Sequence, residues 1–426
     1  MAVEFQWPWV GIAIPCVLIS VLSYGSHWFV LRHHMDKADQ IKFQAYVSVI
    51  WITYLIAIWK NPGTPPKNFN PKVGEWRRWC KKCENYKPER THHCRSCNQC
   101  VLKMDHHCPW TNNCVGHENF PHFLRFVVSV VVTTGWLLIE LFKRLVQYYE
   151  DRNLPSYLID KREMFAVIFL LPIDLFVFAT ITILLGRCII NLIFKGMTQI
   201  EVWEKERIEQ QFYSERMWAQ IRQNYFKLYK KPLPELTSWN HDSRYYDELA
   251  QKEDELDELE ETQTSFELHE HQLQQEEHND NQESLVPKSF TMDDIVFPYD
   301  YGLWSNLIQA CGYPWMWLMP LGGPRGNGYV FPPNEYVEED QLGLPWPPDG
   351  GHQEISVINN QPDFDDLLTD DHTIRPQDLG PLRRRLDPRL NLSRKEWMNE
   401  MGETLNDFGV DVDAEAYDKE DIIPTN

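Results

Sequence analysis

Four long apolar stretches, separated by charged segments, dominate the first half of the chain. The first two contain no Asp, Glu, Lys or Arg, and the fourth continues as an apolar sequence through Phe194 after a single Arg187. A bilayer core about 30 Å thick needs about 20 helical residues, so each stretch is long enough to cross a membrane. The pattern predicts four transmembrane helices, at about 9–31, 43–59, 123–142 and 164–186.

The first apolar stretch has a second interpretation, as a secretory signal peptide. Such a peptide begins with a positively charged segment, whereas residues 1–8 contain Glu4 and neither Lys nor Arg. We therefore expect this stretch to be retained as a membrane helix.

One carboxylate, Asp174, lies inside the fourth apolar stretch. A charged side chain at the middle of a bilayer costs roughly 2.5–3.5 kcal/mol on insertion scales, so Asp174 should face other helices or water. An ion or proton site is one interpretation. A single isolated acid favours the simpler one, a hydrogen bond between helices.

The distribution of positive charge indicates which side of the membrane each loop occupies. Four spans leave both termini on one side, and Lys and Arg accumulate in cytosolic loops. Residues 60–122 carry 11 Lys and Arg, against three in residues 31–42 and five in residues 143–163. We therefore expect the 60–122 segment and both termini to be cytosolic.

The second half of the chain is polar and acidic. The 426 residues include 62 Asp and Glu against 41 Lys and Arg, and the net charge of −21 argues against broad binding to nucleic acid. Residues 199–231 predict a charged, aromatic helix, whereas residues 241–283 hold 16 Asp and Glu and predict a disordered linker. We expect the aromatic segment 297–318 to pack on another part of the protein, and residues 319–426 to be a largely disordered acidic tail.

Together these patterns predict an all-α polytopic membrane protein, with four transmembrane helices and a small cytosolic cysteine-rich domain between the second and third. The expected divisions are 1–59 (helices 1 and 2), 60–122 (cysteine-rich domain), 123–195 (helices 3 and 4), 196–318 (juxtamembrane helix, acidic linker and aromatic motif) and 319–426 (tail).

Seven of the ten cysteines fall between Cys80 and Cys114, in the segment expected to face the cytosol. Cytosolic thiols stay reduced, so this density favours metal or thiol chemistry over a disulfide scaffold.

Cys-x2-Cys pairs present two thiolates to one tetrahedral zinc ion, and residues 80/83 and 94/97 form such pairs, with 97/100 as a competing pair. Two closed zinc sites need eight ligands, and the cluster offers seven Cys and four His. If six Cys and two His are used, one thiol is left over. The histidines are His92, His93, His106 and His107.

Composition does not identify the surplus thiol, but the neighbours of Cys108 suggest a chemical role. Asp105 and His106 precede it, and the rigid residue Pro109 follows it. A free thiol is largely protonated at neutral pH, so a neighbouring base increases the population of the nucleophilic thiolate. A carboxylate can orient the imidazole, as in an Asp–His–nucleophile triad. The pattern favours Cys108 as a nucleophile.

At these residues the sequence resembles the DHHC protein S-acyltransferases, or palmitoyltransferases. The matching motifs are both Cys-x2-Cys pairs, His93-Cys94, Cys100, Asp105-His106-His107-Cys108, Pro109-Trp110 and Asn113-Cys114-Val115-Gly116. The resemblance implies two zinc sites, one on Cys80, Cys83, His93 and Cys100 and the other on Cys94, Cys97, His107 and Cys114. It leaves Cys108 free as the acyl carrier, with His106 as general base and Asp105 as the residue that orients it.

Weaker family motifs occur with substitutions. Asn61-Pro62-Gly63 resembles Asp-Pro-Gly, and Thr198-Gln199-Ile200-Glu201 resembles Thr-Thr-x-Glu with Gln in place of the second Thr. Asn119 and Phe123 fit Asn-x3-Phe, and residues 299–306 resemble an aromatic motif that packs near the active site. The short N-terminus and small luminal loops are most similar to the fungal, endoplasmic-reticulum branch. The expected location is therefore the endoplasmic-reticulum membrane, with the Golgi membrane as the alternative.

The resemblance also implies an activity and its partners. Cys108 would take a long-chain acyl group from acyl-CoA, such as palmitoyl-CoA, and pass it to a cysteine of a membrane-associated protein. The cofactors would be two structural zinc ions, with acyl-CoA as co-substrate and the lipid bilayer as surroundings. A covalent intermediate of this kind predicts ping-pong kinetics.

Two other functions are compatible with part of the sequence. A membrane-tethered zinc adaptor of ubiquitin-ligase type needs eight ligands but has no use for Asp105, His106 and Cys108. An ion transporter built on Asp174 leaves the cysteine cluster unexplained. The acyltransferase interpretation accounts for both the metal ligands and the surplus thiol.

Overall fold

Four helices of the protein are long and apolar enough to cross a membrane, as the sequence predicts. They are Pro8–His34, Lys37–Trp59, Phe120–Asn153 and Lys161–Phe194. Each is longer than its apolar stretch, because hydropathy detects the part inside the hydrocarbon whereas the helix continues into the flanking polar residues. The computed structural model describes residues 7–72, 74–155, 157–212, 214–231, 236–237, 288–289, 295–317, 319, 321–335, 343–351, 388–416 and 418–419.

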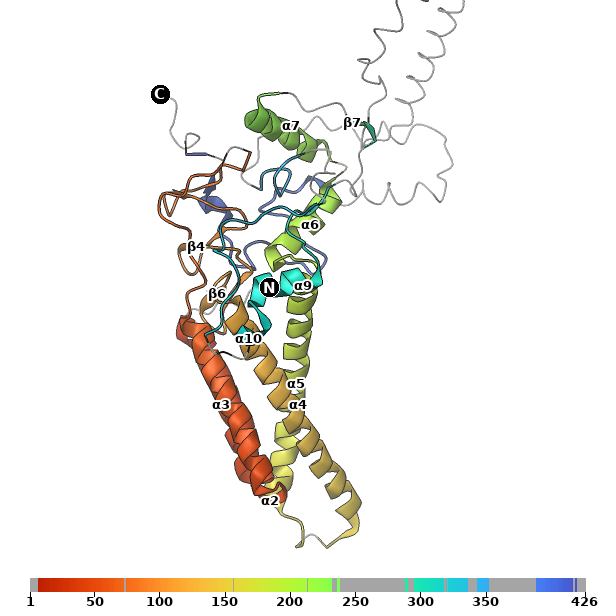
Figure 1. Ribbon diagram of the computed structural model, residues 1–426. Coiled ribbons are helices and arrows are strands. Elements are labelled where there is room, and N and C mark those ends of the chain that lie inside the picture. The colour runs from red at the N-terminus through yellow and green to blue at the C-terminus, as the bar shows by residue number, and fades with distance from the viewer. Residues whose placement is uncertain are drawn as a thin grey trace, which may run out of the picture.

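The four spans form one bundle, with α4 packed against both α3 and α5. The connection between α4 and α5 lies at the end of the bundle opposite the cysteine-rich hairpins (Figure 1). The elements are α1 (Pro8–Ser20), η1 (Val21–Gly25), η2 (His27–Leu31), α2 (Arg32–His34), α3 (Lys37–Trp59), α4 (Phe120–Glu150), η3 (Asp151–Asn153), α5 (Lys161–Cys188) and η4 (Ile189–Phe194).

Apolar side chains from all four spans make the core of the bundle, and Asp174 is buried within α5. Its side chain faces other helices, as expected, and none of it is exposed. Neither carboxylate oxygen has a hydrogen-bond partner within the described part of the chain, so the expected interhelical hydrogen bond is not found there. The core residues are Leu22, Val30, Leu31, Phe43, Val47, Leu137, Leu141, Val167 and Leu170.

Three short antiparallel hairpins form the cysteine-rich domain. Their register places His93 opposite Cys100 and His107 opposite Cys114. The chain adopts the left-handed conformation one residue after each Cys-x2-Cys pair, at Glu84 (φ 50°) and Asn98 (φ 50°), which turns it back sharply. The strands are β1 (Trp79–Cys80), β2 (Asn85–Tyr86), β3 (His92–Cys94), β4 (Gln99–Val101), β5 (His106–Cys108) and β6 (Asn113–Val115).

The helix expected over residues 199–231 is present as two helices, α6 (Gln199–Gln211) and α7 (Glu215–Tyr229). The break is fixed by Ser214, whose side chain accepts a hydrogen bond from the Met217 amide and caps α7. Within the aromatic segment, α9 (Leu303–Cys311) and α10 (Pro314–Trp317) pack near the start of α4. The remaining short elements are β7 (Leu236–Thr237), β8 (Lys288–Ser289), η9 (Pro388–Asn391), η10 (Val412–Ala414) and β9 (Glu415–Ala416). The acidic linker expected at 241–283 lies outside the described residues.

The expectation of a largely disordered tail over residues 319–426 does not hold for residues 388–416. Strand β9 pairs with β1, so the end of the chain adds a third strand to the first hairpin, in the order β2-β1-β9. Trp397, Leu405 and Val410 are buried in one core with Cys94 and Cys114. These apolar residues stand singly among polar ones, so a reading of composition does not reveal their packing.

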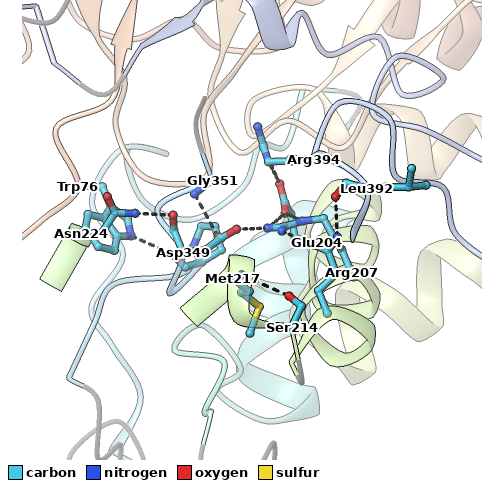
Figure 2. Close-up of polar contacts among 12 residues, drawn as sticks. Trp76, Glu204, Arg207, Ser214, Met217, Asn224, Asp349, Gly351, Leu392 and Arg394 are labelled. Atoms are coloured by element: carbon cyan, nitrogen blue, oxygen red, sulfur yellow. Dashed lines mark hydrogen bonds and ion pairs between the residues drawn. The ribbon is translucent and has the colours of Figure 1, made fainter. Parts of the chain in front are cut away.

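Buried ion pairs join this C-terminal segment to α6 (Figure 2). Arg394 contacts Glu204 at 2.5 Å and Glu415 at 2.9 Å. Arg207 contacts Glu204 at 2.9 Å and Asp349 at 2.6 Å. All five side chains are buried, so part of the acidity of this half of the chain neutralises interior arginines.

We expect Arg394→Ala to destabilise the region outside the spans by about 3–5 kcal/mol, because two buried carboxylates each lose one of their cationic partners. The thermal unfolding midpoint of the purified protein in detergent would fall. Lys395→Ala is the matched control, because its ion pair with Asp413 is exposed and contributes less than about 1 kcal/mol. Equal, small shifts for the two variants would contradict a stabilising role for the buried network.

Candidate active site and metal centres

Two groups of four side chains in the hairpins have the composition and spacing of metal sites. The nitrogen and sulfur atoms of each group lie within 4.8 Å of one another. In the first, His93 Nδ1 lies 3.4 Å from Cys80 Sγ and 3.3 Å from Cys83 Sγ. In the second, His107 Nδ1 lies 3.4 Å from Cys97 Sγ. The groups are Cys80, Cys83, His93 and Cys100, and Cys94, Cys97, His107 and Cys114.

These separations fit a tetrahedral zinc ion. Bonds of about 2.0–2.3 Å place neighbouring ligand atoms of a tetrahedron about 3.6 Å apart. The turn after each Cys-x2-Cys pair also directs an amide toward sulfur, from Cys83 to Cys80 at 3.4 Å and from Cys97 to Cys94 at 3.3 Å. A donor that approaches a sulfur atom favours the thiolate form that binds metal. Both groups supply four ligands each, which leaves no open position for a substrate.

Two of the four histidines in the cluster belong to neither group. His92 lies 3.4 Å from the buried carboxylate of Glu415 on the C-terminal segment. His106 Nδ1 lies 2.8 Å from Asp105 Oδ2. The structure therefore separates the two adjacent histidines of β5, since His107 faces the metal group and His106 faces Asp105.

Cys108 is the cysteine between Cys80 and Cys114 that lies outside both metal groups. Its thiol is buried, and His106 is close enough to interact with it electrostatically. Burial lowers the pKa of His106, but Asp105 and Cys108 more than compensate and raise it to about 10. Burial raises the pKa of Cys108, but His106 and Thr111 outweigh this and lower it. The raised pKa of His106 and the lowered pKa of Cys108 both favour an imidazolium beside a thiolate at neutral pH.

Apolar residues from the ends of the spans nearest the hairpins surround Cys108. The ring of Phe123, in the first turns of α4, meets His106 edge-on at 5.6 Å between centroids. Cys188 and Cys311 belong to the same cluster, which sequence reasoning missed because they lie far away along the chain. The buried members are Cys108, Val115, Phe120, Phe123, Val127, Cys188, Leu192, Ala310 and Cys311.

Comparison with known proteins decides the family. Residues 74–206 match the family model described as DHHC palmitoyltransferase. The chain is 57% identical over 423 residues to the curated palmitoyltransferase PFA4 of Debaryomyces hansenii, covering 99% of this chain and 98% of the relative. The chain belongs to the DHHC palmitoyltransferase family. Its similarity to other proteins named palmitoyltransferase PFA4 is also nearly full-length: 45% identity with that of Candida albicans and 38% with that of Saccharomyces cerevisiae, each over 97% of this chain and 100% of the relative.

The Asn61-Pro62-Gly63 segment, where other DHHC proteins have Asp-Pro-Gly, keeps a turn that only glycine allows. Asn61 Oδ1 accepts a hydrogen bond from the Gly63 amide at 2.8 Å, as an Asp oxygen would. Gly63 has a φ of 97°, outside the range of other residues, and its carbonyl accepts from the Leu102 amide at 3.0 Å. The substitution of Asn for Asp therefore leaves the junction between α3 and the hairpins intact.

The Asn-x3-Phe motif of the DHHC family supports the third hairpin from the start of α4. Asn119 Oδ1 accepts from the Gly116 amide at 2.9 Å, and Asn119 Nδ2 donates to the Cys114 carbonyl at 2.7 Å. A Cβ at Gly116 would lie 2.5 Å from Val101, so the close approach requires glycine. The motif thus fixes the strand that carries Cys114 to the helix that carries Phe123.

The Thr-Thr-x-Glu motif of the DHHC family corresponds to the start of α6, where the departure at Gln199 has a structural explanation. Thr198 and Glu201 form a capping box, and Glu201 pairs with the buried Arg90 at 2.6 Å. The backbone amide of Gln199, rather than its side chain, donates to Asp105 Oδ1 at 2.8 Å. The Asp105 carboxylate therefore lies at the positive end of a helix and is bound by backbone rather than by the side chain that departs from the motif.

The aromatic motif packs near the active site, as the resemblance to the DHHC family implies. Tyr299 donates from its hydroxyl to Glu89 at 2.6 Å, and the Arg90 guanidinium lies 4.8 Å from the centre of its ring. Asn306 Nδ2 donates to the Ile193 carbonyl at 3.1 Å. These contacts place α9 against the C-terminal end of the fourth span.

We expect elemental analysis of the purified protein to give two zinc ions per chain. Cys97→Ala should lose zinc and order together, because structural zinc contributes roughly 10–16 kcal/mol of apparent binding energy in small finger peptides. Cys80→Ala should behave in the same way. Cys16→Ala, in the first span and outside both groups, is the control and should retain two zinc ions. One zinc ion or none in active protein would rule out the two-site assignment.

Proposed function

We propose that this protein transfers a long-chain acyl group, such as palmitoyl, from acyl-CoA to cysteines of membrane-associated proteins through a thioester on Cys108. The observation that carries the proposal is the separation of ligands from nucleophile. Eight side chains form two closed metal groups, and the remaining thiol of the cluster, Cys108, interacts electrostatically with a hydrogen-bonded His106–Asp105 pair. A zinc-binding adaptor would have no use for the group formed by Asp105, His106 and Cys108.

In the first step the Cys108 thiolate attacks the carbonyl carbon of the acyl-CoA thioester. The new bond joins Cys108 Sγ to that carbon, and the bond to the CoA sulfur breaks. The His106 imidazolium stabilises the thiolate before attack and can give its proton to the departing CoA thiolate. Asp105, which accepts from His106, holds the ring in this orientation and stabilises its charged form.

In the second step His106, now neutral, takes the proton from the thiol of a substrate cysteine. The substrate sulfur attacks the acyl-Cys108 carbonyl, and Cys108 leaves as the thiolate that His106 again stabilises. The two half-reactions together return the site to its starting protonation state. Ping-pong kinetics follow, because CoA departs before the protein substrate reacts.

The metal groups have a supporting role in this mechanism. Cys94, Cys97, His107 and Cys114 would hold one zinc ion, and Cys80, Cys83, His93 and Cys100 the other. Bound zinc would supply structural cross-links and no chemistry, because closed four-ligand sites have no position for a reactant. Since His107 precedes Cys108 in β5, fixing His107 also fixes the nucleophile.

The membrane spans give the acyl chain an apolar place to lie. The cluster around Cys108 includes residues of α4 and α5, so the thioester forms where the spans begin. A sixteen-carbon chain extends through about one leaflet of a roughly 30 Å core, which the helices can enclose. Substrate cysteines are therefore those held at the membrane surface.

The charge distribution supports a cytosolic active site, and the resemblance to the fungal branch of the family suggests an internal membrane. The 11 Lys and Arg of residues 60–122 favour the cytosolic side for the cysteine-rich domain, with both termini on the same side. Acyl-CoA and reduced thiols are also cytosolic. The proposed location is the endoplasmic-reticulum membrane, with the Golgi membrane as the alternative.

We expect Cys108→Ser to abolish both the thioester adduct and transfer to substrate, because a serine hydroxyl has no comparable ionised population near neutral pH. The assay labels tagged protein with an alkyne-bearing acyl-CoA, before and after hydroxylamine. Zinc content and membrane insertion should not change. Cys16→Ser is the control and should label as the wild type does. A Cys108→Ser chain that still carries a hydroxylamine-labile acyl group would refute the mechanism.

His106→Ala should slow self-acylation by about 10²–10⁴-fold, the range that general acid–base groups supply, while both zinc ions remain bound. Asp105→Asn should slow it less, because an amide can still orient the ring but does not stabilise the imidazolium. Single-turnover labelling of Cys108 measures both rates. Loss of zinc from His106→Ala would show that His106 is a ligand and that the two adjacent histidines are wrongly assigned.

A further inference from the structure

The C-terminal segment contacts the catalytic strand directly. The Phe408 carbonyl accepts a hydrogen bond from the His107 amide at 2.8 Å, one residue before the nucleophile. Gly409 packs so closely on His107 that a Cβ there would lie 2.6 Å from the His107 Cβ. On β3, Val410 forms a bridge with Cys94. Residues at the end of the chain therefore cover the strands that hold the second metal group.

A few residues earlier, the same segment reaches the catalytic carboxylate through a series of side chains. Glu403 Oε2 lies 3.4 Å from the Arg187 guanidinium, and the same guanidinium nitrogen donates to Gln199 Oε1 at 3.0 Å. The Gln199 amide donates to Asp105 Oδ1 at 2.8 Å. Glu403 is thus connected to Asp105 by two intervening residues, Arg187 at the end of the fourth span and Gln199 at the start of α6.

Glu403 is itself held firmly in place. Its carbonyl accepts from Trp203 Nε1 at 2.9 Å, and Trp203 is buried. Its amide donates to Asn399 Oδ1 at 2.8 Å, and its carboxylate accepts from Asn399 Nδ2 at 3.0 Å. These contacts aim the carboxylate at Arg187 whether or not the ion pair forms.

From this geometry we propose that Glu403 and Arg187 form a positioning relay that acts through the side chain of Gln199 on Asp105. The inference rests on the proposed acyltransferase mechanism and adds a role for the C-terminal segment within it. The relay also explains why Gln stands at position 199, where the family motif has Thr. The long amide side chain reaches Arg187, which a shorter, branched threonine at this position would not do.

The Arg187–Glu403 ion pair is too exposed to contribute much to folding, whereas other, buried contacts hold the C-terminal segment in place. Arg187 is 39% exposed and Glu403 is 20% exposed, so their ion pair contributes little to stability. The segment is anchored independently by β9 and by the buried pairs of Arg394 (Figure 2). Removing the relay should therefore leave the segment in place while it loosens the first turn of α6 against Asp105.

The test measures acylation of Cys108 in the full-length protein, reconstituted in vesicles, over a range of alkyne-palmitoyl-CoA concentrations. The variants are Gln199→Ala, Glu403→Ala, the double variant and the conservative Gln199→Glu. Lys395→Ala is the matched control on the same segment, because its exposed pair with Asp413 does not contact β5. Zinc content and thermal midpoint are recorded for every variant.

We expect each single alanine variant to lower the maximal acylation rate roughly two- to tenfold. The half-saturating acyl-CoA concentration, zinc content and thermal midpoint should stay as in the wild type. The double variant should be no slower than the slower single variant, because both changes interrupt one path. Gln199→Glu, which retains an oxygen that accepts from Arg187, should keep the wild-type rate.

Several results would overturn the relay. Wild-type rates in Gln199→Ala would do so, as would single effects that multiply in the double variant. Loss of zinc or of thermal stability in parallel with the rate would show a purely structural role. A wild-type protein without any adduct on Cys108 would refute the proposed function itself, an outcome distinct from normal acylation in all variants.

Discussion

The arrangement of the site around Cys108 depends on the two hydrogen bonds that the Asp105 carboxylate accepts. One oxygen lies 2.8 Å from the ring of the next residue, His106, and the other accepts from the first residue of α6 at 2.8 Å. The first contact belongs to the cysteine-rich domain and the second to the helix that follows the fourth span. A single side chain therefore orients the ring of His106 and also joins the hairpins to the helix that follows the membrane bundle, close to the thiol of Cys108.

Around this carboxylate, residues of the DHHC family motifs connect separate elements through hydrogen bonds and an ion pair. The turn at Asn61 and Gly63 joins the second span to the hairpins, and Asn119 joins the third hairpin to the third span. Glu201 and Arg90 join α6 to the second hairpin through a buried ion pair. The cysteine-rich domain is thus attached to two spans and to α6, so β5 keeps one orientation relative to the bundle.

Features that depend on local pattern could be predicted from the sequence, and features that depend on distant contacts could not. Apolar length gives the four spans, and the Cys-x2-Cys spacing with a ligand count gives two metal groups and one surplus thiol. The split of the helix at Ser214 and the approach of Cys188 and Cys311 to Cys108 depend on tertiary packing.

The order of the C-terminal segment could not be predicted for another reason. Its acidic residues have the composition of solvated chain, yet Glu415 is buried against Lys87 at 2.5 Å and Arg394 at 2.9 Å. Composition counts charges but does not show which of them are neutralised by a partner from elsewhere in the chain.

The pairing of β9 with β1 also has a consequence for how the protein is made. Ribosomes synthesise chains from the N-terminus, so the first hairpin emerges before the third and fourth spans, and the third strand of its sheet, β9, emerges after all four spans. A chain that ends prematurely, before residue 388, would retain all four spans and all eight metal-ligand residues. It would nevertheless leave the edge of β1 and the surface over Cys94 uncovered. Completion of this domain therefore requires synthesis of the chain through Ala416, well beyond the last span.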